Sequence, residues 1–120
     1  MNCRFCKLDP KRNKMIFSTK NFVFFLDNFP IIKGHSLLAP KNHIRKESKI
    51  PKDQWSEYIE LSNKAYQYIK KKYSRYPLVF INAPQDQSVK HFHKHFIPGY
   101  FGYLGVSKAL TNFLKENKNV

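Results

Sequence analysis

The sequence lacks any long apolar run, since no stretch approaches the roughly 18 residues that a membrane-spanning helix requires. Residues 1–7 also lack the apolar core of a secretory signal, so we expect a cytoplasmic protein that does not span a membrane. Cysteine is scarce, with only Cys3 and Cys6 in the chain. A structural disulfide is not expected without secretion, and the Cys-x-x-Cys spacing is that of half a zinc site or of a redox pair.

Acidic residues are few, because 8 Asp and Glu stand against 22 Lys and Arg, which gives a formal net charge of +14. Such a charge attracts polyanions, so nucleotides, polyphosphates and nucleic acid are candidate partners, the last through non-specific attraction. A biased genome composition also produces a chain rich in Lys, Asn, Ile, Phe and Tyr. The charge alone does not choose between these explanations.

The length of 120 residues suits one core, and we expect a single domain over 1–120. Short apolar runs bounded by turn residues predict strands at 15–18, 22–26, 36–40, 78–81 and 89–97. Apolar residues at intervals of three or four predict a long helix over about 52–74, and a shorter helix is predicted at 106–114. This order indicates an α+β fold: an antiparallel sheet of about five strands, one long helix packed on one face, and a short C-terminal helix.

Three of the five histidines alternate along one predicted strand, at His91, His93 and His95. Alternate residues of a strand share a face, so the three imidazoles are expected to project together, while Phe92 and Phe96 point to the core. Lys94 falls on the apolar side and interrupts it. The row of imidazoles can bind a metal, can provide a nucleophile with acid–base neighbours, or can be a chance run on an exposed strand.

A polar loop, residues 82–88, precedes the histidines. Asn82 and Gln87 offer amides, Ser88 offers a hydroxyl, and the backbone offers N–H groups, which are the groups that bind and polarise a phosphate. An ordinary connection between two strands has the same composition, so the loop supports a phosphate site only together with the histidines.

Three segments together resemble the histidine triad (HIT) superfamily of nucleotide hydrolases and transferases. His91–Ile97 resembles the alternating His and apolar residues of the triad. Gly34–Ile44, which contains Pro-Lys-x-His-Ile, resembles a strand and turn of that family. Cys3–Lys7 resembles the N-terminal Cys-x-Phe-Cys-Lys of its zinc-containing members. The resemblance implies a HIT-like fold.

The resemblance also implies a catalytic role for each matching residue. His93 matches the nucleophile, which attacks the α-phosphorus and forms a nucleotidyl-histidine that water then hydrolyses. His95 is expected to donate a hydrogen bond to a non-bridging phosphate oxygen, and His35 to support the triad. Ser88 and Gln87 are expected to hold phosphate or leaving-group oxygens.

Two further sets of residues take their roles from the same resemblance. Asp27 matches the residue that accepts the ribose hydroxyls, and Phe25 is expected to help form an apolar slot for the base; a plain turn-forming role for Asp27 is the alternative. In zinc-containing relatives the matching ligands of a structural Cys₂His₂ site are Cys3, Cys6, His43 and His91.

The implied activity is hydrolysis of a nucleoside phosphoramidate or a dinucleoside polyphosphate. Two alternatives stay open: removal of adenylate from nucleic-acid ends, as in the aprataxin branch, and a nucleotide-binding protein without catalysis. Residues 99–120 contain neither Cys nor His, which argues against a C-terminal zinc finger of the aprataxin type. The resemblance also implies a homodimer that pairs the long helix and a sheet strand of each subunit.

Overall fold

Five strands form one antiparallel sheet in the computed structural model, which describes residues 3–99 and 105–117. The strands are β1 (Met15–Ser18), β2 (Phe22–Leu26), β3 (Ser36–Pro40), β4 (Pro77–Phe80) and β5 (Lys94–Pro98). Their spatial order is β1-β2-β3-β5-β4, and every neighbouring pair is antiparallel. The predicted fold class is therefore confirmed.

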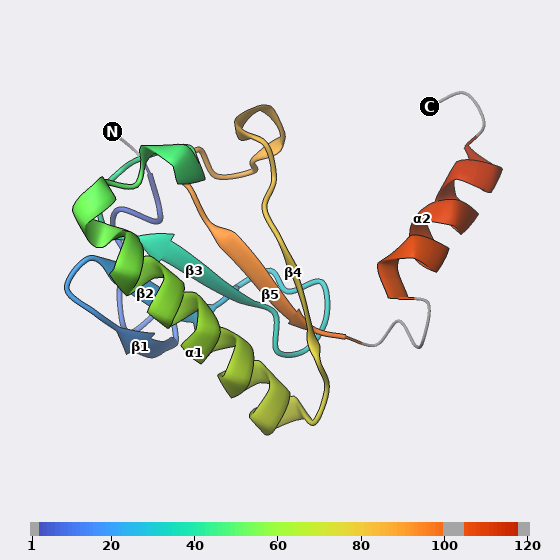
Figure 1. Ribbon diagram of the computed structural model, residues 1–120, viewed down its shortest axis with the longest axis horizontal. Coiled ribbons are helices and arrows are strands. Elements are labelled where there is room, and N and C mark those ends of the chain that lie inside the picture. Colours follow the sequence, from blue (N-terminus) through green and yellow to red (C-terminus); the bar gives the residue numbers. More distant parts are fainter. Residues whose placement is uncertain (1–2, 100–104, 118–120) are drawn as a thin grey trace.

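The long helix α1 (Trp55–Tyr73) packs across one face of the sheet (Figure 1). It follows a 3₁₀ turn at Lys52–Gln54, so the helix predicted from about residue 52 is confirmed with a tighter first turn. Its buried residues recur at helical spacing, which gives the apolar face that meets the strands: Tyr58, Leu61, Ala65 and Ile69.

The short helix α2 (Gly105–Glu116) stands apart from the sheet in Figure 1. None of its residues is buried, and Leu110 and Leu114 are 56% and 55% exposed. The shorter helix predicted at 106–114 is therefore present, and its Leu110 and Leu114 face solvent in the single chain. No helix within residues 3–99 and 105–117 combines the length and the hydropathy that membrane crossing needs.

Both faces of the sheet are covered, which explains why β2 and β3 are buried over nearly their whole length. On one face Phe24, Leu38 and Phe96 pack in a core with α1. On the other face the N-terminal segment supplies the cover, because Cys3 and Phe5 pack on the side chains that alternate strand residues direct there. These side chains are Val23, Phe25, Leu37 and Ala39.

The strand predicted over 89–97 is wrong in its first half, since β5 begins only at Lys94. Its partner β3 ends at Pro40, which has no N–H to extend the hydrogen bonds between the two strands. The carbonyl of Pro40 instead accepts a hydrogen bond from the ring of His91. A tight turn, closed by a 2.8 Å hydrogen bond from the His91 N–H to the carbonyl two residues earlier, bends the chain there. His91 and His93 therefore lie in the segment that leads into β5, and His95 lies in the strand.

Lys94 is half-buried between β5 and α1. Its ammonium donates a 3.2 Å hydrogen bond to the Ser62 hydroxyl and lies over the rings of Tyr58 and Phe96, 5.0 and 5.8 Å from their centroids. Burial lowers the pKa of Lys94, and the charge of Glu47 acts in the opposite sense. A hydroxyl and two aromatic faces thus accommodate the cation that interrupts the apolar side of the histidine segment.

Glu57, in the first turn of α1, connects the helix to the turn between β1 and β2. Its carboxylate accepts hydrogen bonds from the Thr19 hydroxyl and from the backbone and side-chain N–H groups of Asn21, the latter two at 2.9 and 2.7 Å. Burial acts to raise the pKa of the Glu57 carboxyl, but these hydrogen bonds outweigh it and leave the pKa below its ordinary value.

We expect Glu57→Ala to lower the free energy of unfolding by about 1–2 kcal/mol, because hydrogen bonds to a partly exposed carboxylate are lost. Since folding lowers this pKa, the contribution is complete above the unfolded-state value of about 4.3 and is lost as the pH falls through the folded-state value. Urea unfolding between pH 7 and pH 3 measures it, with the exposed Glu60→Ala as control. Equal losses in the two variants, or a Glu57 effect that grows as the pH falls from 7 to 3, would contradict the assignment.

Candidate active site and metal centre

Four potential metal ligands from three separate segments meet beside the sheet. Cys3 and Cys6 come from the N-terminal segment, His43 follows β3, and His91 precedes β5; their ligand atoms all lie within 4.8 Å of one another. The Sγ of Cys6 lies 3.2 Å from Nδ1 of His43 and 3.3 Å from Nδ1 of His91, and the Sγ of Cys3 lies 3.4 Å from the latter. Ordinary tetrahedral zinc bonds separate sulfur and nitrogen ligands by about 3.5 Å, so the four donors fit a zinc ion.

The ring of His91 has the tautomer that a metal ligand needs. Its Nε2 lies 2.7 Å from the carbonyl oxygen of Pro40, which can only accept, so Nε2 carries the proton. The lone pair of a neutral ring is then on Nδ1, which faces the two sulfur atoms. Burial lowers the pKa of His91, which favours this neutral form.

His93 has the opposite tautomer. Its Nδ1 lies 2.7 Å from the carbonyl oxygen of His91 and must donate, so Nε2 of the neutral ring keeps a free lone pair. No residue in the described part of the chain hydrogen-bonds to that Nε2. Burial lowers the pKa of His93; the bond to the carbonyl and the charge of Asp27 oppose the shift, and the charge of Arg4 adds to it. A neutral imidazole with a free lone pair can act as a nucleophile.

His95 is linked to His35 through a short relay. The backbone N–H of Ile31 donates to Nδ1 of His35 at 3.0 Å, so the proton of the neutral His35 ring is on Nε2. That Nε2–H donates a hydrogen bond to Nδ1 of His95, 2.8 Å away, and the proton of the neutral His95 ring is therefore on its own Nε2. Within the described residues this buried Nε2–H has no partner, so it can donate to a substrate oxygen.

Both members of the relay are held neutral by their surroundings. Burial, followed by the nearby rings of His93 and His35, lowers the pKa of His95 to about 4, against a small opposing effect of Asp27. Burial likewise lowers the pKa of His35. At neutral pH the pair therefore provides a directed N–H donor without carrying charge.

Two aromatic rings that sequence reasoning missed hold the histidines in place. Phe80 of β4 stacks on His95 with centroids 4.3 Å apart and planes 3° apart. Phe5 contacts His93 edge-on at 5.0 Å and His91 at 6.1 Å. Phe80 is paired with His95 in the register of β4 against β5. The strand order of the sheet would have predicted this contact, but the sequence analysis did not give that order.

Asp27 and Phe25 lie near the relay of His35 and His95, and each makes contacts within the protein besides its expected contact with a nucleotide. One carboxylate oxygen of Asp27 accepts the backbone N–H of Phe29 at 2.9 Å, which is the turn-forming role, while the other lies 3.6 Å from Nε2 of His35. Phe25 is 1% exposed because the ring of Phe5 packs on it at 5.4 Å. The cavity between them is about 10 Å³, so Phe25 offers no open face to a base in this conformation.

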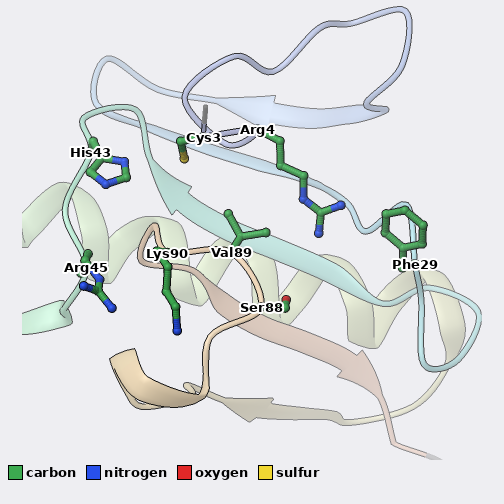
Figure 2. Close-up of a pocket in the computed structure, with 8 residues that line it drawn as sticks. All are labelled: Cys3, Arg4, Phe29, His43, Arg45, Ser88, Val89 and Lys90. Atoms are coloured by element: carbon green, nitrogen blue, oxygen red, sulfur yellow. The ribbon is translucent and has the colours of Figure 1, made fainter. Parts of the chain in front are cut away.

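The loop residues predicted to bind phosphate lie in different surroundings. Gln87 is buried, and its amide Nε2 donates to the Arg45 carbonyl at 3.0 Å, while its Oε1 has no partner in the described chain. Ser88 is exposed and lines a pocket that Cys3 and His43 of the four-donor cluster also line (Figure 2). Asn82 is half-buried and forms no hydrogen bond with another described residue. The structure thus brings Ser88, but not the amide of Gln87, to an open surface.

Comparison with known proteins places this geometry in a family. The model of the HIT domain family matches residues 10–102. The chain belongs to the HIT domain family. An uncharacterized HIT-like protein of Methanocaldococcus jannaschii is 33% identical to this HIT domain over 104 residues, which cover 83% of this chain and 81% of that protein.

Solved structures of other HIT proteins share the fold of this HIT domain. A HIT family protein from Bacillus subtilis superposes with a TM-score of 0.75 at 23% identity, covering 96% of each chain. A HIT family hydrolase from Legionella pneumophila gives 0.67 at 26% identity, covering 82% of this chain and 93% of that one. A Zn-bound histidine triad protein from Mycobacterium smegmatis gives 0.72 at 24% identity, covering 85% and 78%.

The four-donor cluster predicts about one tightly held zinc per chain, measurable by mass spectrometry of the metal content. We expect Cys3→Ser/Cys6→Ser to lose the metal and to lower Tm by about 10 °C or more, because the N-terminal segment then no longer stays fixed to the sheet. Ser18→Ala, at an exposed strand position, is the control. A double variant that keeps its full zinc content would rule out this ligand set.

Proposed function

We propose that this HIT domain is a nucleotide hydrolase or nucleotidyl transferase that cleaves at the α-phosphate of a nucleoside phosphoramidate or a dinucleoside polyphosphate. The observation that carries the proposal is a pair of opposite tautomers on adjacent rings, whose centroids are 4.8 Å apart. His93 presents a free lone pair at Nε2, and His95 presents an N–H donor at its Nε2. Nucleotidyl transfer needs a nucleophile beside a donor that stabilises negative charge on phosphate oxygens.

In the first step the Nε2 lone pair of His93 forms a bond to the α-phosphorus. The bond from phosphorus to the leaving oxygen or nitrogen breaks on the opposite side, and the leaving group departs with that electron pair. A nitrogen leaving group takes up a proton from solvent as it departs and is released as the amine. The attached imidazole keeps its Nδ1–H, which stays bonded to the His91 carbonyl and so offsets the positive charge that forms on the ring. The buried Nε2–H of His95 donates to a non-bridging oxygen throughout.

In the second step a water oxygen attacks the same phosphorus, the phosphorus–nitrogen bond breaks, and its electron pair returns to Nε2 of His93. The water gives up a proton to solvent, and the nucleoside monophosphate leaves. Dividing one difficult displacement into two easier steps is the gain from the covalent intermediate.

The remaining predicted residues support these steps. His35 fixes the tautomer of His95, since its Nε2–H occupies the Nδ1 lone pair of that ring. The free carboxylate oxygen of Asp27 lies beside His35, where it can accept a ribose hydroxyl. Ser88 lies on the open side of the loop and is assigned to leaving-group oxygens. Gln87 holds the backbone at Arg45 in this conformation, so phosphate contact by its amide requires a side-chain rotation.

We also propose that Cys3, Cys6, His43 and His91 hold a structural zinc. When bound, the ion would provide a closed tetrahedral site with no open position for substrate. The Zn-bound Mycobacterium smegmatis neighbour and the donor distances above support this assignment. A zinc ion at this site would act on catalysis by holding His91 in place, because the carbonyl of His91 orients the ring of His93.

Three expectations from the sequence stay predictions. They are a homodimer, a cytoplasmic location and a non-specific attraction to nucleic acid. Trp55 and Ile59, which are 51% and 55% exposed on α1, are consistent with a second chain packing on that helix.

We expect His93→Ala to lower kcat for release of nucleoside monophosphate by about 10⁴-fold or more, because the nucleophile is lost, while nucleotide binding stays close to wild type. Product chromatography on a panel of dinucleoside polyphosphates, adenosine phosphoramidate and adenylated DNA measures turnover, and calorimetry measures nucleotide binding. Intact-protein mass spectrometry at early times should show the added nucleotidyl mass in wild type and not in His93→Ala.

His95→Ala is the matched variant for the neighbouring ring. We expect a loss of about 10²–10³-fold in kcat, the usual effect of removing one donor to developing charge, with the covalent intermediate still formed. If His93→Ala releases product at near wild-type rate, the mechanistic assignment is wrong.

A further inference from the structure

The short helix α2 has an apolar side that the described residues of the chain leave open. Apolar side chains recur along it at helical spacing and so share one side: Val106, Leu110, Phe113 and Leu114. The last three of these are 56%, 52% and 55% exposed, and no residue of α2 is buried. By the same spacing the two lysines of the helix, Lys108 and Lys115, lie on the other side. The helix is therefore amphipathic, with a cationic polar side.

The end of α1 places further cations beside the start of α2. Residues 74–78, which follow α1, line a pocket of about 430 Å³ together with the first two residues of α2. Lysine and arginine fill the last turn of α1 and the turn after it: Lys70, Lys71, Lys72 and Arg75. The ammonium of Lys70 lies 4.8 Å from the ring centroid of Tyr76, which is itself 67% exposed. A cluster of cations thus adjoins the amphipathic helix.

No carboxylate from the same segments balances these cations. Residues 61–85 and 105–115 contain neither Asp nor Glu, and Glu116 stands at the far end of α2. In the part of the chain that the structure describes, the three lysines Lys70–Lys72 form no ion pair. Lysines in the last turn of a helix interact favourably with its dipole, which explains their position on α1. The dipole does not explain the apolar side of α2 next to them.

An apolar strip flanked by cations is complementary to the surface of an anionic phospholipid membrane. Apolar side chains enter the boundary between headgroups and acyl chains, while Lys and Arg meet the lipid phosphates. Other occupants match only one of the two features. Single-stranded nucleic acid meets the charge, but its bases stack on aromatic rings and leave the leucines exposed. A second copy of this chain covers the leucines but brings another net charge of +14 to the same place.

We propose that α2 and the cationic end of α1 together form a surface that binds anionic phospholipid membranes peripherally. The 12 residues of α2 are too few to cross a bilayer, so the helix lies in the plane of the interface with its apolar side inserted. Figure 1 shows α2 on the side of the molecule away from β1. The surface contains no residue assigned to catalysis or to zinc, so this inference does not depend on the proposed function.

Sedimentation of the full chain with lipid vesicles tests the apolar contribution. We expect vesicles of phosphatidylcholine with about 30% phosphatidylglycerol to bind wild type at least about 10-fold more tightly than vesicles of phosphatidylcholine alone. Leu110→Ser/Phe113→Ser should weaken binding to the anionic vesicles by about 10-fold or more, and both positions are exposed, so the fold is kept. Ile31→Ser/Ile59→Ser, at positions 70% and 55% exposed elsewhere on the molecule, is the matched control and should bind as wild type does.

A second pair of variants tests the charge contribution. Lys71→Gln/Lys72→Gln should weaken binding to the anionic vesicles by about 10-fold and leave binding to phosphatidylcholine alone unchanged. Lys49→Gln/Lys52→Gln removes the same charge from exposed positions before the start of α1 and should have no effect. Equal binding of wild type to the two kinds of vesicle overturns the proposal, as does an equal loss of binding in either variant and its control.

Measurements on the other two occupants complete the test. Wild type that binds a single-stranded oligonucleotide but not the anionic vesicles identifies nucleic acid as the partner and overturns the proposal. Sedimentation velocity that finds a dimer in wild type and a monomer in Leu110→Ser/Phe113→Ser shows that a second copy covers α2, which also overturns it; the same oligomeric state in both supports it. None of these measurements reads turnover, so a failure of the proposed function leaves their outcome unaffected.

Discussion

The hydrogen bond from Nδ1–H of His93 to the carbonyl oxygen of His91 is the interaction on which the candidate site depends. A carbonyl can only accept, so this one contact determines which nitrogen of His93 keeps a lone pair. The relay from Ile31 through His35 imposes the opposite choice on His95. Burial keeps these rings neutral, so both choices persist at neutral pH. Two identical side chains thereby receive complementary chemical roles from their backbone and side-chain partners.

The cluster of Cys3, Cys6, His43 and His91 and the candidate active site are parts of one arrangement, because His91 belongs to both. Its ring faces the two cysteines, and its carbonyl orients His93. The N-terminal segment that supplies the cysteines also covers the sheet face that carries the histidines, and its Phe5 packs against His91 and His93. The same segment contributes Arg4 to the pocket that Ser88 lines. Fixing the N-terminal segment therefore shapes the nucleophile's surroundings and one wall of that pocket together.

Features that depend on local alternation could be predicted from the sequence, and features that depend on contacts between distant segments could not. Alternation with Phe correctly directed His93 and His95 away from α1, because Phe92 packs in the core against that helix. The first residue of β5 depends on Pro40 in the neighbouring strand, which no pattern within residues 89–97 reveals. The orientation of the Gln87 amide depends likewise on a carbonyl 42 residues away in the chain. Arg45 and Lys90 both donate to the Pro84 carbonyl in the loop that precedes the histidines, and the Arg45 contact likewise joins segments far apart in the chain.

The most direct measurement of the central claim is the tautomer of each histidine ring. Long-range ¹H–¹⁵N correlation spectra of protein labelled with ¹⁵N-histidine resolve which ring nitrogen carries the proton. At pH 7 the account predicts a neutral His93 protonated at Nδ1, with His35 and His95 neutral and protonated at Nε2; His95 should titrate only near its pKa of about 4. A His93 ring that is charged at pH 7, or that carries its proton on Nε2, would contradict the account.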